Sequence, residues 1–412
     1  MRYIFHVDVN SAFLSWSAVY RLREQGEELD LRTVPAVIGG NEDSRQGIVL
    51  AKSVPCKRYG IETAEPLASA RRKCPGLIIE PSNFTVYRKY SHEFISLLRS
   101  YATEVYQYSI DEAWAVFDDC ENIYGDMVEF AYKLKDEIYE KLGFTVNIGV
   151  SQQFLLAKIA GDFEKPNKVH TLFIEEREQK LWPLPVNVLL YVGRKMTESL
   201  RKLGIMTVKD LYDADPAVIN SNLGKFGMTL WNNVHGEDLD PSIMEEADQK
   251  GYGNSTTTPK DTTDWDRAKE ILIYLADNIG SRLRSDGVYA SCICVTVRYP
   301  DFTHISKQMV IENAINSTTA IYENACKILE LIWDGKRPIR QLGIRATKVV
   351  SDRYEQLSLF GMTDDGVEDR GKDDTTVINK PSEEKRNLAD SAMDELNRKM
   401  GKKMVKRGRE IK

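Results

Sequence analysis

The sequence predicts a mixed α/β protein, an α+β arrangement of more than one domain. Short alternating segments of β-forming residues are followed by stretches with apolar residues at helical spacing. A polar, glycine-containing stretch separates two such units near residue 255. The 412 residues are 42% hydrophobic, which is enough for several cores and excludes a fibrous or wholly disordered chain.

The first three-fifths of the chain alternates strands and helices. In order we expect a strand at 3–9, a helix to residue 22 capped by Asn10 or Ser11, a strand at 47–50, helices at 68–73 and 87–101, a hairpin at 109–112, a helix at 127–142, a strand at 144–150 and a helix capped by Ser151. This last helix must end near Glu164 because Pro166 follows.

The remaining elements fall into three stretches. Residues 175–240 are predicted to form short helices with glycines between them, and 251–259 a flexible boundary. A second α+β unit follows, with a helix at 264–285, a strand at 288–299, a helix at 316–333 and a strand at 340–350. Residues 363–374 carry six acids and two bases, and 396–412 eight bases and one acid, which predicts a disordered tail with one helix around 384–400.

Composition limits the class of protein. Six cysteines without a CxxC pair predict free thiols and a cytoplasmic location. Five histidines without a close pair disfavour a zinc enzyme. No run of about 18 uncharged apolar residues occurs, so no membrane-spanning helix is expected. The net charge of −6 disfavours a nucleic-acid coat protein but leaves room for a local basic groove.

Three acidic residues are candidates for a metal site. Asp8 ends the first strand, just before a helix N-terminus whose backbone N–H groups suit phosphate oxygens. Asp111 and Glu112 are adjacent in a hairpin with apolar, β-forming flanks. Converging carboxylates suit two Mg²⁺ ions, which activate an attacking hydroxyl. Each feature alone favours an ordinary solvated turn or strand end, and a shared site requires that the strands be neighbours.

Three blocks of sequence resemble the signature motifs of the bacterial Y-family (DinB/UmuC-like) translesion DNA polymerases. They are residues 8–13, 108–114 and 157–167. Residues 47–60 are similar to the UmuC-like version of the family's fingers segment. The resemblance extends in order from residue 1 to about residue 360.

The resemblance implies a right-hand polymerase architecture. The implied parts are a ferredoxin-like palm at 1–10 and 80–174, small fingers at 11–79, a helical thumb with a helix–hairpin–helix at 175–240, a linker at 241–252, a DNA-binding little finger at 253–350, a clamp-binding segment at 351–362 and a charged, disordered tail at 363–412.

The function that the resemblance implies is error-prone, template-directed DNA synthesis opposite damaged bases, without proofreading. Primer-template DNA and deoxynucleoside triphosphates would be its substrates, within DNA repair and the SOS response, and the enzyme would act as a cytoplasmic monomer. Two alternatives are a nucleotide cyclase-like palm enzyme and a non-catalytic, clamp-tethered DNA-binding subunit. The first would not need a basic second unit, and the second would not keep the three acids.

Carried over by position, Asp8, Asp111 and Glu112 resemble the family's catalytic, metal-binding carboxylates. The carbonyl of Val9 would be a further ligand of the two Mg²⁺ ions. Phe13 stands where the family has an aromatic steric gate against a 2′-hydroxyl, although a core aromatic on a helix is the alternative.

Two lysines match positions that contact the incoming triphosphate. Lys165 matches the lysine that reaches the triphosphate, with a solvated helix end as the alternative, and Lys57 replaces a basic residue that is often arginine. Val54 departs from the usual tyrosine, and Asn10 and Ala12 from a frequent acid and a frequent aromatic.

Basic clusters mark two segments expected to touch DNA. Five bases lie within 189–209, the predicted helix–hairpin–helix of the thumb, and five lie within 335–348: Arg194, Lys195, Arg201, Lys202, Lys209, Lys336, Arg337, Arg340, Arg345 and Lys348. Arg340 and Arg345 cannot share a face of a regular strand.

The segment after the last predicted strand resembles the bacterial sliding-clamp-binding pentapeptide. It comprises Gln356, Leu357, Ser358, Leu359 and Phe360. The alternative is a strand end packed on its own domain. Its position before a charged tail favours a clamp-binding peptide.

Overall fold

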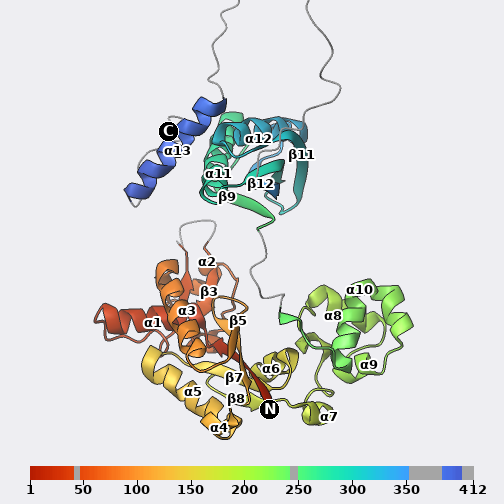
Figure 1. Cartoon of the computed structure of the whole chain (residues 1–412). Helices are drawn as coiled ribbons and strands as arrows, with labels where there is room; N and C mark the ends of the chain where they lie inside the picture. The colour runs from red at the N-terminus through yellow and green to blue at the C-terminus, as the bar shows by residue number, and fades with distance from the viewer. Residues whose placement is uncertain (41–46, 242–248, 352–382, 401–412) are drawn as a thin grey trace, which may run out of the picture. The chain divides into compact units, whose positions relative to one another are not determined.

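Five strands in the order β5-β6-β1-β7-β8 form the main sheet of the first of two units, residues 1–246 and 247–412 (Figure 1). The computed structural model describes residues 1–40, 47–241, 249–351 and 383–400. The strands are β1 (Arg2–Val9), β5 (Glu104–Gln107), β6 (Glu112–Asp118), β7 (Val146–Ser151) and β8 (Val169–Thr171). β1 is antiparallel to both β6 and β7, so it lies at the centre of the sheet.

Alternation along β1 assigns its side chains to two different cores. Phe5 and Val7 point into a core built with the helices on one face, whereas Ile4 points into a core on the other face. The helices are α1 (Ala12–Glu24), α3 (Phe84–Arg99) and α5 (Met127–Leu142) on the first face, and α6 (Phe154–Gly161) on the second. Because side chains alternate, His6 and Asp8 project on the same side as Ile4, toward α6.

A smaller sheet with strand order β3-β2-β4 lies within the first unit. Its elements and the short helices near them are β2 (Ala36–Gly39), β3 (Val49–Lys52), a 3-10 helix (Val54–Tyr59), α2 (Leu67–Lys73) and β4 (Ile78–Pro81). Val37, Cys56 and Leu67 form part of a separate small core here. The short helix α4 (Glu121–Tyr124) instead belongs to the main core, where Tyr124 stacks on Phe130 of α5. The predicted strand at 47–50 is displaced by two residues, and β2 and β4 were not predicted.

The helical stretch that was predicted for 175–240 is confirmed. It contains 3-10 turns at Ile174–Glu176 and Val186–Val188, and the helices α7 (Arg177–Lys180), α8 (Arg194–Lys202), α9 (Val208–Tyr212) and α10 (Pro216–His235). Gly224 has a φ of 62° and kinks α10, which glycine tolerates at little cost. Lys209 pairs with Asp213 and packs over Trp182, so it is not a freely projecting base.

The predicted cap of α6 is wrong. The Ser151 hydroxyl donates to the carbonyl of Leu172, across the sheet edge. The backbone N–H groups of Phe154 and Leu155 instead donate to the carboxylate of Asp238, at 2.8 and 3.1 Å. The cap therefore comes from a residue more than 80 positions away, and the helix ends at Gly161, three residues earlier than expected.

The second unit is a four-stranded antiparallel sheet in the order β11-β10-β12-β9, with two helices on one face. Its elements are β9 (Gly251–Thr262), α11 (Trp265–Ser285), β10 (Tyr289–Arg298), β11 (His304–Ile315), α12 (Thr318–Ile332) and β12 (Ile339–Val350). Ile293, Val295 and Val297 alternate along β10 into the core beneath the helices. The predicted helices and the strands near 290 and 345 are confirmed.

The flexible boundary expected at 251–259 is a strand, so that prediction is wrong. β9 pairs with β12, and the buried Thr258 hydroxyl donates to the carbonyl of Arg340 at 3.0 Å. β9 is an edge strand, so Pro259, which lacks a backbone N–H, interrupts no hydrogen bonds to a further strand on the open side. β11 was also missed. Most of the predicted linker at 241–252 lies outside the described residues, and its last two residues begin β9.

The helix that was predicted around residues 384–400 is confirmed, and the neighbouring residues 363–382 and 401–412 lie outside the described residues. Glu383–Lys399 form α13, as the expected helix around 384–400 suggested. Asp390 is buried, accepts from the backbone N–H of Thr318 at 2.9 Å and pairs with Arg284 at 3.3 Å. Asp394 pairs with the same guanidinium at 2.7 Å. The helix thus docks on its polar side and exposes an apolar stripe of Leu388, Ala392, Leu396 and Met400.

None of the helices in the described parts of the chain is long and apolar enough to cross a lipid bilayer.

Candidate active site

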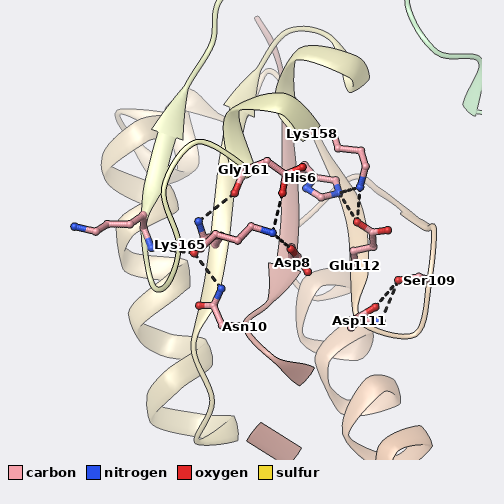
Figure 2. Close-up of polar contacts among 12 residues, drawn as sticks. His6, Asp8, Asn10, Ser109, Asp111, Glu112, Lys158, Gly161 and Lys165 are labelled. Atoms are coloured by element: carbon pink, nitrogen blue, oxygen red, sulfur yellow. Dashed lines mark hydrogen bonds and ion pairs between the residues drawn. The ribbon is translucent and has the colours of Figure 1, made fainter. Parts of the chain in front are cut away.

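Asp8 and Glu112 lie directly opposite each other on neighbouring strands. The antiparallel register of β1 and β6 pairs Asp8 with Glu112 and His6 with Trp114. Directly opposed side chains share a face of the sheet, with Cβ atoms about 5 Å apart. The condition that the sequence left open is met, because the strand of Asp8 and the hairpin of Glu112 are neighbours (Figure 2).

The turn before β6 holds Asp111 beside this pair. The backbone N–H of Val9 donates to the carbonyl of Asp111 at 3.0 Å, which ties the end of β1 to the turn. The Ser109 hydroxyl donates to Asp111 Oδ1 at 2.6 Å. On the other side, the Ser91 hydroxyl of α3 donates to the carbonyl of Ile110 at 2.5 Å. The turn is therefore anchored at several points.

Glu112 is held by two nitrogen donors that the sequence did not single out. Lys158 Nζ lies 2.5 Å and His6 Nε2 lies 3.2 Å from Glu112 Oε2. Burial by itself would raise the pKa of Glu112, but the hydrogen bonds from His6 and Lys158 lower it to about 2. Burial lowers the pKa of His6 and thus favours its neutral ring, whose tautomer with the proton on Nε2 donates to Glu112. Glu112 is therefore an anion over the whole physiological range.

Asp8 is held by Lys165, a residue 157 positions away. The two side chains form an ion pair, and Lys165 also contacts Asp162 at 2.8 Å. Burial raises the pKa of Asp8, and the ion pair with Lys165 opposes this rise. Two carboxylates of the site thus have separate lysine counter-ions, Lys165 for Asp8 and Lys158 for Glu112.

Asn10 links β1 to the loop that carries Lys165. Its side-chain amide donates to Asn147 Oδ1 at 3.1 Å, and its oxygen accepts from the backbone N–H of Asn167 at 2.9 Å. Asn147 in turn donates to the carbonyl of Glu164 at 2.6 Å. The residue that the sequence presented as a departure from the family thus helps to position the loop next to Asp8 (Figure 2).

A cavity of about 220 Å³ opens beside Asp8. Its lining consists of Asp8, Val9, Asn10, Ser11, Lys52, Ser53, Val54, Lys57, Lys165 and Pro166. The structure therefore brings Asp8, Lys57 and Lys165 together from three separate segments of the sequence. Ser11 is the N-cap residue of α1, one of the two positions predicted, but it has a φ of 48° and its side chain makes no capping hydrogen bond.

Phe13 is not among the residues that line this cavity. Its ring stacks on Tyr87 of α3 with centroids 4.7 Å apart, and Phe84 lies edge-on at 5.8 Å. It is only partly buried, at the margin of the first core. These contacts fit both interpretations of Phe13, as an aromatic that packs the core and as one that presents its exposed edge to a ligand.

The donor set has the chemistry of a Mg²⁺ site. Asp8, Asp111 and Glu112 offer carboxylate oxygens and Val9 a main-chain carbonyl, all hard ligands. Within the described residues, however, no three acidic, histidine or cysteine side chains are gathered closely enough to hold an ion between them. Lys165 and Lys158 neutralise two of the carboxylates instead.

The second unit carries a separate polar surface on the open face of its sheet. A hollow of about 980 Å³ is lined by residues of all four strands, among them Asn254, Arg298, His304, Gln341 and Arg345. Arg340 instead packs over the ring of Phe302, 4.9 Å from its centroid, and Arg337 pairs with Asp301 at 2.6 Å. Arg340 and Arg345 thus differ in surroundings, as the strand period predicted.

The proposed clamp-binding residues Gln356, Leu357, Ser358, Leu359 and Phe360 lie outside the described residues.

Sequence reasoning missed His6 and Lys158. His6 stands two positions before Asp8 on a strand. Because side chains two positions apart on a strand lie on the same face, this spacing could have indicated that His6 lies near Asp8. Lys158 belongs to the block 157–167 that was quoted for its resemblance, but only Lys165 was singled out in it.

The chain matches two family models. Residues 7–162 match the impB/mucB/samB family, and residues 249–359 match the C-terminal domain of the same family. The chain is 42% identical over 358 residues to "DNA polymerase IV" of Clostridium acetobutylicum, which covers 87% of this chain and 89% of that protein. It is 32% identical to "DNA polymerase IV 1" of Bacillus subtilis, over 100% of this chain and 94% of the relative.

A solved structure shares the fold. It is titled "Y-family DNA polymerase chimera Dbh-Dpo4(243-245)-Dbh", with a TM-score of 0.70 and 24% sequence identity. The match covers 85% of this chain and 100% of that chain.

Proposed function

Because the chain belongs to the impB/mucB/samB family, the Y family of DNA polymerases, we propose that Asp8, Asp111 and Glu112 are its catalytic carboxylates. The chain is a DNA-directed DNA polymerase of the translesion type, acting on primer-template DNA and deoxynucleoside triphosphates. The observation that carries the site assignment is the register of β1 and β6, which sets Asp8 opposite Glu112 with Asp111 in the adjoining turn. Relatives named as polymerases over nearly the whole chain disfavour a cyclase or a non-catalytic subunit.

The proposed metal ligands are Asp8, Asp111, Glu112 and the carbonyl of Val9. Polymerases of this family use divalent metal ions, and the oxygen donors present here favour two Mg²⁺ ions. When bound, such ions lower the pKa of the attacking primer hydroxyl and neutralise charge on the departing pyrophosphate. The protein itself supplies the anchored turn that orients Asp111 and the strand pairing that fixes Asp8 against Glu112.

The triphosphate is proposed to lie in the cavity beside Asp8. Lys57 and Lys165 line this cavity, and Lys165 can exchange its carboxylate partner for a phosphate oxygen. The uncapped N-terminus of α1 faces the same region through Ser11 and adds backbone N–H donors. Phe13, on the first turn of α1, is proposed to select the sugar, as tested in the Discussion.

The domain roles follow from the same family assignment. We propose that residues 1–10 and 80–174 form the palm, 11–79 the fingers and 175–240 the thumb. The open sheet face with Arg298 and Arg345 is proposed to lie against duplex DNA, because it is the uncovered side of the sheet and carries bases.

Primer extension tests this function directly. The purified full chain with a primed template, the four deoxynucleoside triphosphates and Mg²⁺ should extend the primer, and excess EDTA should stop extension. Templates with an abasic site should still support insertion opposite the lesion. An absence of extension on undamaged template with either Mg²⁺ or Mn²⁺ would contradict the proposed function.

Residues 356–360 are proposed to recruit a sliding clamp. Gln356 supplies an amide that donates and accepts, and Leu357, Leu359 and Phe360 are the apolar anchors. Because a short peptide that orders on binding has modest affinity, tethering contributes more than contact area. Replacing Leu359 and Phe360 with alanine should leave distributive synthesis unchanged and abolish the stimulation by a loaded clamp. Full stimulation of the double variant, or its failure without a clamp, would contradict this role.

A further inference from the structure

We propose that Lys158 is a positioning residue for Glu112: it holds one carboxylate oxygen and so fixes how the other is presented to the catalytic site. This inference rests on the proposed function of Glu112 and adds a residue with no role in it so far. It starts from the position of Lys158 on α6, outside the strands and the turn that carry the carboxylates.

The ammonium group of Lys158 is enclosed on several sides. Besides Glu112, it faces the rings of Tyr108 and Trp114, with Nζ 5.1 and 5.7 Å from the two ring centroids. The side chain of Lys158 is 15% exposed, far less than a typical surface lysine. Two aromatic faces and one carboxylate therefore restrict where the charge of Lys158 can lie.

The contact uses only one of the two carboxylate oxygens. Lys158 Nζ and His6 Nε2 both approach Oε2, and they lie 3.4 Å from each other. Among the described residues no group donates a hydrogen bond to Oε1 of Glu112. Lys158 and His6 thus hold Oε2, whereas Oε1 is left without a donor from the described residues and can serve as a ligand.

The neighbouring packing keeps this arrangement in place. His6 is 1% exposed and lies edge-on to Trp114, with centroids 4.9 Å apart. α6 approaches the sheet very closely at Gly149, where an added Cβ would lie 1.9 Å from the carbonyl oxygen of Ala157, the residue before Lys158. Lys158 is therefore fixed against β7 through its backbone and against Glu112 through its side chain.

A purely structural ion pair and a positioning role predict different kinetics. Removing a group that orients a ligand of a metal site lowers activity by about 10–100-fold. The lost charge is positive, so removing it does not weaken attraction of a divalent cation to the carboxylates. We therefore expect kcat of Lys158→Met to fall about 10–100-fold, with no increase in the Mg²⁺ concentration for half-maximal rate.

The experiment compares the wild type with three variants of the full chain. Lys158→Met removes the charge, Lys158→Arg restores a donor and should recover part of kcat, and Lys141→Met removes an exposed lysine paired with Glu137 as a matched control. Primer extension gives kcat and the Mg²⁺ dependence, and calorimetry with Mn²⁺ in the absence of DNA gives cation binding. Melting temperatures show whether each variant is folded.

The expected result is a lower kcat for Lys158→Met, a partial recovery in Lys158→Arg and no loss in Lys141→Met. Mn²⁺ binding to Lys158→Met should be as tight as in the wild type or tighter. Four outcomes would overturn the inference: an unchanged kcat, a loss fully restored by added Mg²⁺, an equal loss in Lys141→Met, or weakened Mn²⁺ binding. If Lys158→Met does not fold, Lys158→Gln takes its place as the variant without the charge, and an unchanged kcat of that variant would overturn the inference. If the wild type extends no primer, the proposed function itself is wrong. If the wild type is active and Lys158→Met has the same kcat, only the role of Lys158 is wrong.

Discussion

Alanine at Asp111 or Glu112 is expected to abolish primer extension while leaving the fold and DNA binding in place. A carboxylate that binds a catalytic cation contributes several kcal/mol of transition-state stabilisation. The expected loss in rate is therefore about a thousandfold or more. Asp111 sits in an anchored turn and Glu112 at the start of β6, so neither replacement removes a large apolar contact. Single-turnover extension with saturating Mg²⁺ measures the loss.

The matched control is Asp118→Ala, at the far end of the same strand. Asp118 is half exposed and faces Arg2 rather than the site, so its removal should leave the rate of extension unchanged. Melting curves and binding to primer-template DNA establish that each variant is folded. Near-normal extension by both Asp111→Ala and Glu112→Ala would contradict the assignment of the catalytic site.

Much of the fold was predictable because local pattern and tertiary packing agree. The β-forming residues of β1 match a strand that is buried on both faces, and the apolar spacing of α5 matches a helix with one buried face. β9 was misjudged because its threonines and glycines are typical of loops in isolation. They form a strand only because β12 offers a backbone partner, and no local signal contains that partner.

In the candidate site, too, the contacts between segments distant in sequence could not be predicted. The three carboxylates could be proposed from the sequence because of their chemistry and the resemblance. Lys158 could not be assigned to Glu112, because α6 reaches the sheet through the close packing at Gly149. His6 could not be assigned to it either, because its place beside Glu112 depends on the pairing of β1 with β6. The true cap of α6, Asp238, is likewise a long-range contact. Contacts between distant segments depend on topology, which periodicity does not encode.

The second large effect concerns Phe13 and the choice of sugar. Phe13→Ala should raise the efficiency of ribonucleotide insertion about 10–100-fold relative to deoxynucleotide insertion. The reason is that a rigid ring beside C2′ excludes an added hydroxyl at a steric cost of about 1–3 kcal/mol. The measurement is kcat/KM for one ribonucleoside and one deoxynucleoside triphosphate opposite the same template base.

The contacts of Phe13 also predict what would be observed if its ring only packs the core. The ring of Phe13 stacks on that of Tyr87, with centroids 4.7 Å apart. If the ring only packs the core, Phe13→Ala should therefore lower the stability of the protein by about 3–5 kcal/mol. Such a variant would show a lower melting temperature and equal losses with both sugars. Phe84→Ala is the matched control, because Phe84 is half exposed and touches Phe13 edge-on. Unchanged sugar selection in Phe84→Ala, together with altered selection in Phe13→Ala, would assign the exclusion of ribonucleotides to the Phe13 ring itself.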